Sequence, residues 1–184
     1  TRAVPHATVI DPVDATEFTQ AVRASVRQPG LVYMRGLRGT VSRLLDPEKY
    51  VFEVGKTYRL RDGGGPGIIA TGAGTEWAIE VSRLLEGAGI DHALLHVPTL
   101  KPARQEEIWR FCGGGRRVVT RGNEKIVGGV GGVVAEIKEG EAGGPRLTRL
   151  GVPDHWAPGG SLGFIRQSLG LDAESLARRI KEAA

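Results

Sequence analysis

Short apolar segments alternate with helix-length segments along most of the chain, and this alternation limits the possible folds more than any other feature. The expected strands cover residues 57–60, 68–71, 93–97, 117–120 and 147–150. The expected helices cover residues 75–87, 104–111 and 128–138, and two short helices close the chain, the last at 173–182. Strands separated by helices need crossover connections, which give parallel pairing and cover both faces of a sheet. We therefore expect a doubly wound α/β domain with a mainly parallel sheet and helices on both faces.

A strand–helix–strand block precedes this pattern. Residues 8–10 are expected to form a strand, and Asp14 can cap the helix that follows, with Glu17 at the capping-box distance. A second short strand is expected at 31–34. Two strands and one helix cannot cover their own apolar faces, so the block needs a larger sheet to join. We expect it to close an upstream domain, with something missing before Thr1.

The segment after this block has the character of a linker. Residues 39–54 carry mixed charge, an Asp-Pro step and no sustained hydrophobic period, as a surface connection between domains does. We accordingly divide the chain into residues 1–45, the tail of the upstream domain with its linker, and residues 46–184, the closing α/β domain.

Composition excludes several classes of protein. The chain has 25 basic and 21 acidic side chains, a net charge of +4, but without the basic clusters and interleaved aromatics of a nucleic-acid surface. No apolar run approaches the roughly 20 residues that cross a bilayer, and the N-terminus lacks the design of a signal peptide. The single cysteine, Cys112, cannot form an internal disulfide and is expected to be a buried structural thiol. We expect a cytoplasmic protein that binds neither nucleic acid nor a membrane.

A Gly-x-Gly turn follows one expected strand and opens a helix, which makes Gly72, Gly74 and Thr75 a weak candidate for an anion site. Asp91 lies near the distance at which a dinucleotide fold places its ribose-binding acid. However, Trp77 stands where the third glycine of that fingerprint is needed. A tight turn is the simpler interpretation, and a bound nucleotide or other anion is the alternative.

A second glycine-rich junction, Gly128–Gly132, opens another expected helix. Each glycine inside a helix costs about 1 kcal/mol relative to alanine, so something must approach closely there, and packing is favoured over a ligand. The four histidines, His6, His92, His96 and His155, have no metal-ligand spacing, and no nucleophile elbow or phosphate-loop motif is present. We expect no catalytic residue and no metal ligand in this chain.

Two arginines after the strand at 31–34 form the sharpest candidate site. Arg35 and Arg38 each have a glycine directly after them, which leaves room around the guanidinium groups. Arginine at a rigid strand end suits bidentate capture of a phosphate or carboxylate. On these residues alone, a role of the two arginines in interdomain salt bridges is supported equally well.

Taken in order, these segments resemble the C-terminal portion of the transketolase family. Asp11–Thr16 and Pro29–Arg35 look like the D-P-x-D-A-x-E run and the P-x-Y-x-R strand that end the family's pyrimidine-binding domain. Further similar segments follow in family order: Phe52–Lys56, Ile68–Gly72, Gly89–Ile90, Val97–Pro102, Val118–Thr120, Gly128–Gly131, Leu150–Asp154 and Gly170–Asp172. The run Met34–Gly39 is most similar to the C-terminal subunits of split transketolases, with deoxyxylulose-phosphate synthase as a near relative.

The resemblance implies a ketol-transfer enzyme that uses thiamine diphosphate and Mg²⁺, which the complete enzyme binds and this chain alone does not. It implies a partner, either an upstream transketolase half or an N-terminal subunit, in a homodimer or a heterotetramer. Arg35 aligns with the family's substrate-phosphate arginine, and Arg38 is a second contact, which implies phosphosugar substrates. We expect the chain to be inactive by itself.

Two departures from the family pattern leave the subfamily open. Lys101-Pro-Ala-Arg104 stands in place of Lys-Pro-Leu-Asp, and Arg121-Gly122 stands in place of an acidic pair. Two other functions stay open as well. One is the β-type half of a 2-oxoacid dehydrogenase decarboxylase, although the sequence of Arg35–Gly39 argues against it. The other is a non-catalytic module that binds an anion or nucleotide or that only mediates assembly.

Overall fold

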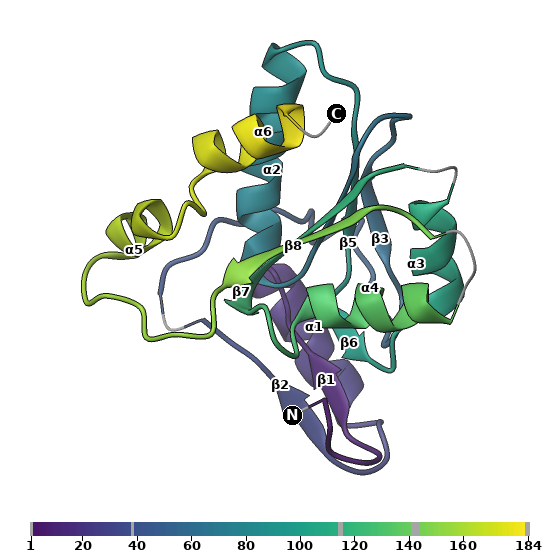
Figure 1. The fold of residues 1–184 in the computed structure, drawn as a ribbon. Coiled ribbons are helices and arrows are strands. Elements are labelled where there is room, and N and C mark those ends of the chain that lie inside the picture. The colour runs from purple at the N-terminus through teal and green to yellow at the C-terminus, as the bar shows by residue number, and fades with distance from the viewer. Residues whose placement is uncertain (1, 38, 114–115, 141–143, 183–184) are drawn as a thin grey trace.

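Five strands form the main sheet of the computed structural model, which describes residues 2–37, 39–113, 116–140 and 144–182 (Figure 1). Their order is β3 (Tyr58–Arg61), β5 (Ala93–His96), β4 (Gly67–Ala70), β7 (Val118–Lys125) and β8 (Leu147–Val152). Strands β5, β4, β7 and β8 run parallel, and only β3 is antiparallel to its neighbour β5. The expected mainly parallel sheet is therefore confirmed.

Helices cover both faces of this sheet, as expected. Helices α2 (Ala73–Gly87) and α6 (Ala173–Lys181) pack on one face, and α3 (Gln105–Cys112) and α4 (Val130–Glu139) pack on the other (Figure 1). Alternate residues of the central strand β4 point to opposite faces, so Ile68 packs with α2 and α6 while Ile69 packs with α3 and α4. The short helix α5 (Leu162–Ser168) buries no side chain and projects away from the sheet.

The glycine-rich junction before α4 serves packing. A Cβ at Gly131 would lie 2.8 Å from Oγ1 of Thr120 on β7 and 3.0 Å from the side chain of Arg149 on β8. Glycine therefore lets the first turn of α4 approach the sheet closely, which is the interpretation that the sequence favoured.

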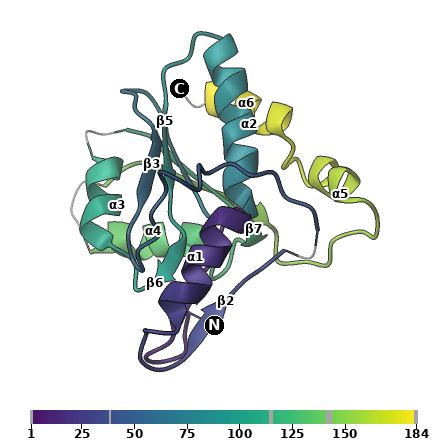
Figure 2. The same cartoon turned by 180° about the vertical axis from the view of Figure 1, so that it is seen from behind.

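The N-terminal block contains β1 (Thr8–Ile10), α1 (Ala15–Ser25) and β2 (Val32–Met34), as its sequence predicted. Asp14 caps α1, because its carboxylate accepts a hydrogen bond from the backbone N–H of Glu17 at 2.9 Å. A third strand, β6 (Thr99–Lys101), was not expected. It follows β5 in the chain and pairs antiparallel with β1, so the small sheet has the order β2–β1–β6. The two blocks therefore share a sheet, and Figure 2 shows α1 beside the lower part of the main sheet.

Apolar side chains of the N-terminal block remain exposed. Phe18 and Val22 on α1 and Val26 directly after it are 39%, 44% and 83% exposed. Leu31 directly before β2 and Tyr33 on β2 are 58% and 41% exposed. Within the described residues, β2 pairs with β1 on one side and with nothing on the other. This edge and apolar surface have the character of a surface that a neighbouring element covers, and the need for a larger sheet stays a prediction.

The segment between β2 and β3 has no helix or strand among its described residues. Tyr50 and Phe52 nevertheless anchor it, since Tyr50 Oη donates to the carboxylate of Glu17 and the Phe52 ring is buried against Ile10 and Ala21. No helix in the described parts of the chain has both the length and the apolarity of a membrane crossing.

Candidate functional site

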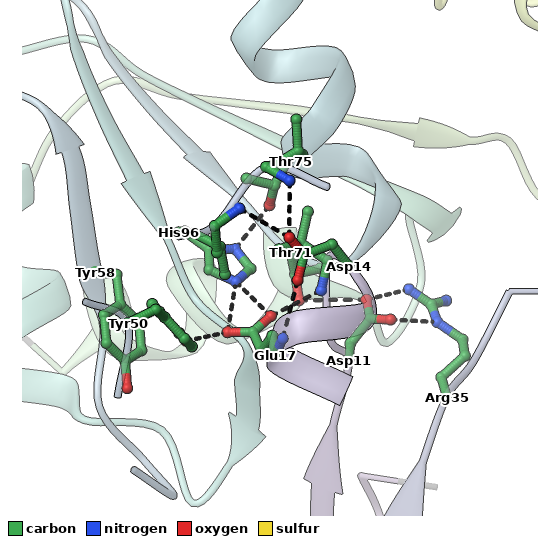
Figure 3. Close-up of polar contacts among 12 residues, drawn as sticks. Asp11, Asp14, Glu17, Arg35, Tyr50, Tyr58, Thr71, Thr75 and His96 are labelled. Carbon is green, nitrogen blue, oxygen red and sulfur yellow. Dashed lines mark hydrogen bonds and ion pairs between the residues drawn. The ribbon is translucent and has the colours of Figure 1, made fainter. Parts of the chain in front are cut away.

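The carboxyl ends of β4 and β5 meet the N-terminal block near Thr71 and His96 (Figure 3). The carboxyl-terminal part of β7 meets it through Glu124. Ligands of parallel α/β sheets normally bind at this edge, where connections from neighbouring strands diverge. Here the backbone of Asp11, directly after β1, accepts a hydrogen bond from the N–H of Gly72 at 3.1 Å and donates one to the carbonyl of Pro98 at 2.8 Å. The edge that could hold a ligand is therefore partly filled by the chain's own residues.

Arg35 makes a two-pronged ion pair with Asp11. Its Nε donates to Oδ1 of Asp11 at 2.8 Å, and its Nη2 donates to Oδ2. The hydroxyl of Thr71 donates to the same Oδ2 at 3.3 Å. Gly72 has φ of +50°, and a Cβ there would collide with the Asp11 carboxylate. The glycine turn after β4 thus makes room for the Asp11 carboxylate, which is an anionic group of the chain itself.

A second carboxylate, that of Glu124, holds Arg35 from the side of β7. Nη2 of Arg35 donates to Oε2 of Glu124 at 2.9 Å and also to Oδ1 of Asn123. Oε1 of Glu124 accepts from the backbone N–H of Val130 at 2.8 Å, which caps the start of α4. Glycines leave room for this side chain, because a Cβ at position 122 or 129 would collide with it.

These charges shift one another's pKa values. Burial raises the pKa of the Asp11 carboxyl, and the ion pair with Arg35 opposes that rise. Burial acts to lower the pKa of Arg35, but the hydrogen bonds and charges of Asp11 and Glu124 outweigh it and raise the pKa. The guanidinium is therefore permanently charged, and its side chain is 26% exposed.

One guanidinium nitrogen of Arg35 remains available. Nη1 makes no hydrogen bond with the described residues, and Figure 3 shows it pointing away from Asp11. Arg35 also lines a pocket of about 380 Å³ together with Arg2, Lys125 and Gly129. Arg38, the second expected phosphate contact, lies outside the described residues.

A separate buried network joins Glu17 on α1 to His96 at the end of β5. Both side chains are fully buried, and Nε2 of His96 lies 2.9 Å from Oε2 of Glu17. Nδ1 of His96 lies 2.7 Å from Oγ1 of Thr75, so the simplest proton assignment has Nε2 donating to the carboxylate and Nδ1 accepting from the hydroxyl. Burial and the charge of Glu17 raise the pKa of Tyr50, whose hydroxyl therefore stays protonated and donates to Glu17.

The three residues of the weak anion candidate all make contacts inside the chain. Gly72 faces the Asp11 carboxylate, and Thr75 bonds to His96. Gly74 packs against β7, because a Cβ there would lie 2.7 Å from the carbonyl oxygen of Arg121. Trp77, where the dinucleotide fingerprint needs a glycine, stacks on the side chain of Arg121.

Other reactive side chains form no cluster. Among the described residues, no group of three or more His, Cys, Asp or Glu side chains could hold a metal ion. Cys112 is 2% exposed, and burial raises its pKa to about 11, which confirms a buried structural thiol. His92 is buried and bonds to Ser82 and to the carbonyl of Ile90, a structural role.

Sequence reasoning selected Arg35 but missed the partners that define its surroundings. Asp11 was expected only as part of a motif and Glu17 only at the capping-box distance from Asp14, and no role was expected for His96 or Glu124. A usable signal was present for Glu124, since glycines at 122 and 129 flank it and it precedes a helix that lacks its own capping side chain.

Comparison with known proteins gives the family. Residues 55–176 match the model of the transketolase C-terminal domain. An uncharacterized transketolase family protein of Sinorhizobium fredii is 40% identical over 98% of this chain and 53% of its own length. The 6-deoxy-6-sulfo-D-fructose transketolase subunit of a Clostridium species is 34% identical over 98% of this chain and 56% of its own length. Deoxyxylulose-phosphate synthases are also among the matching relatives.

A solved structure agrees with these matches. A split gene transketolase, described as an inactive beta4 tetramer, superposes with a TM-score of 0.89 at 29% identity, over 99% of this chain and 59% of that one. The chain thus spans little more than half the length of the two relatives and of this structure. Since the domain match, the relatives and the fold agree, the chain belongs to the transketolase family and forms a C-terminal part of a transketolase-type protein.

Proposed function

We propose that this chain is the C-terminal part of a thiamine-diphosphate-dependent enzyme that transfers a two-carbon ketol unit between phosphosugars. The observation that carries the proposal is the placement of Arg35, a fixed guanidinium beside a pocket, within a chain of the transketolase family. Among the described residues, no group of three or more His, Cys, Asp or Glu side chains is placed to hold a metal ion. The cofactor belongs to other parts of the enzyme in this proposal, and the chain supplies substrate contacts and architecture.

The proposed division of labour assigns residues 1–45 to the end of a pyrimidine-binding domain and residues 46–184 to the closing domain. The unpaired edge of β2 and the exposed apolar side chains of α1 support a missing neighbour on this side. The partner is an upstream transketolase half or an N-terminal subunit, in a homodimer or a heterotetramer, and relatives that are nearly twice as long support this. We place the enzyme in the cytoplasm, which a single buried cysteine suits.

Arg35 binds the substrate phosphate in this proposal, and Arg38 is an additional contact. Asp11 fixes the guanidinium plane through two parallel hydrogen bonds, which leaves Nη1 aimed in one direction. A rigid donor loses less conformational entropy when a phosphate binds than a flexible lysine does. The role of the chain's own residues is thus to hold and orient the far end of the sugar.

The test combines this chain with its upstream half. The two together are expected to convert xylulose 5-phosphate in the presence of thiamine diphosphate and Mg²⁺, while this chain alone is expected to show neither turnover nor binding of the cofactor by calorimetry. In the assembled enzyme, Arg35→Ala should raise KM for the phosphosugar by roughly tenfold or more with a smaller effect on kcat, because one charge-assisted contact of about 1.5–3 kcal/mol is lost.

Lys49→Ala is the matched control, since this cation is 85% exposed and pairs only with Asp46 among the described residues. Its KM should equal that of the unchanged enzyme. An Arg35→Ala enzyme with an unchanged KM would refute the phosphate role. Tight saturable binding of thiamine diphosphate by the 184-residue chain alone would refute the assignment of the cofactor to other parts.

A further inference from the structure

Arg35 carries one positive charge between two negative ones. Asp11 accepts from its Nε and Nη2, and Glu124 accepts from the same Nη2. The three groups together carry a net charge of −1 when both acids are ionised. A phosphate that approached Nη1 would therefore meet one attractive and two repulsive charges.

Neither carboxylate can move aside easily. The Asp11 side chain is 5% exposed and lies against the Gly72 turn, with Thr71 bonded to it. The Glu124 side chain is 14% exposed and is bonded to the start of α4 through the N–H of Val130. Both acids are thus held by contacts other than Arg35, so both carboxyl groups stay beside Arg35 when a ligand binds.

Nearby cations compensate little, because they already have acidic partners. Arg2 pairs with Glu136, and Lys125 pairs with Asp154 at 2.9 Å. Both lie with Arg35 on the same pocket, but each pair is close to neutral as a unit. Among the residues that the structure describes, the charge near Nη1 is therefore set mainly by Arg35, Asp11 and Glu124.

We infer that Asp11 and Glu124 are specificity-determining residues, which weaken the preference of the Arg35 site for a dianionic phosphate over an uncharged hydroxyl end of the sugar. The inference rests on the proposed function, in which Arg35 faces the far end of the substrate. A neutral sugar end can accept a hydrogen bond from Nη1 without repulsion from the acids, whereas a phosphate is repelled by both.

The assembled enzyme tests this with one pair of ketoses, fructose 6-phosphate and fructose, compared as the ratio of their kcat/KM values. Glu124→Gln keeps the size of the side chain and an oxygen for the N–H of Val130 while removing one charge. We expect it to raise the ratio in favour of the phosphorylated sugar by roughly tenfold or more, as the loss of one repulsive charge a few ångströms away implies. Asp11→Asn should act in the same direction.

Asp62→Asn is the matched control, because it removes an exposed carboxylate that pairs with Arg59, and neither of these residues lines the pocket of Arg35. Its ratio should be unchanged. A second measurement is the inhibition constant of inorganic phosphate against fructose turnover. Glu124→Gln should lower this inhibition constant by a similar factor. The increase in the ratio of kcat/KM values should disappear in the Glu124→Gln, Arg35→Ala double variant.

The outcomes separate the two proposals. If Arg35→Ala raises KM for the phosphosugar while neither Glu124→Gln nor Asp11→Asn changes the ratio or the phosphate inhibition constant, the inference is overturned and the proposed function stands. If Arg35→Ala leaves that KM unchanged, the proposed role of Arg35 fails first. An equal change in the Asp62→Asn control would also overturn the inference, since the effect would then follow from overall charge.

Discussion

At the scale of single residues, Arg121 is the most unusual group in the structure. It is 1% exposed, and its guanidinium lies 4.4 Å from the centre of the Trp77 ring. Its hydrogen bonds go to the carbonyl oxygens of Gly122 and Leu171, and no described carboxylate forms a salt bridge with it. Burial and the nearby charge of Arg166 lower its pKa to about 10. The sequence marked this position as a departure from the family but gave no sign that a cation would be buried there.

We predict that Arg121→Met changes the free energy of unfolding by no more than about 1 kcal/mol, because an apolar side chain of similar length avoids the desolvation of an unpaired charge. Trp77→Ala should instead cost about 3–5 kcal/mol, since it removes a large buried ring. Urea denaturation followed by circular dichroism measures both. A loss above about 3 kcal/mol for Arg121→Met would mean that the two carbonyl contacts and the ring more than repay the buried charge.

At the scale of elements, most of the fold could be predicted from the sequence because its signals are local. Hydrophobic periodicity, the Asp14 cap and the turn glycines located the helices and most of the strands to within about two residues. Strand β6 was missed because its three residues alternate too briefly, and its strand conformation depends on pairing with β1, far away in the chain. The partners of Arg35 were missed for the same reason, as Asp11 and Glu124 lie 24 and 89 residues away from it.

The turn between β4 and α2 gives a sharp test of the Asp11 position. Gly72→Ala should destabilise the chain by about 3 kcal/mol or more, because it combines a strained positive φ with a collision against the carboxylate. Gly89→Ala is the matched control, since Gly89 has φ of +69° but open space around it, and should cost only about 1–2 kcal/mol. Thermal or urea denaturation compares them. Equal losses would show that the Asp11 carboxylate does not occupy the turn.

At the scale of the whole molecule, the two blocks are joined by buried polar contacts as well as by a shared sheet. Glu17 belongs to the N-terminal block and His96 to the main sheet, and both are fully buried. Their partner Thr75 is buried as well, and their partner Tyr50 is partly buried. Loss of one partner from a buried polar pair lowers the free energy of unfolding, because the other polar group is left unpaired away from water. The network therefore favours a single cooperative unit over two independently stable blocks.

A double-mutant cycle tests this coupling. We predict that Glu17→Gln and His96→Gln each destabilise the chain by about 2–4 kcal/mol and that the double variant costs less than their sum by about 1–3 kcal/mol. Urea denaturation should show one transition in the unchanged chain. Glu53→Gln is the control, because Glu53 forms an exposed pair with Lys56, and its loss should stay within about 0.5 kcal/mol. Additive losses, or separate transitions for the two blocks, would mean that the shared sheet alone joins them and that the buried pair is energetically independent of the junction.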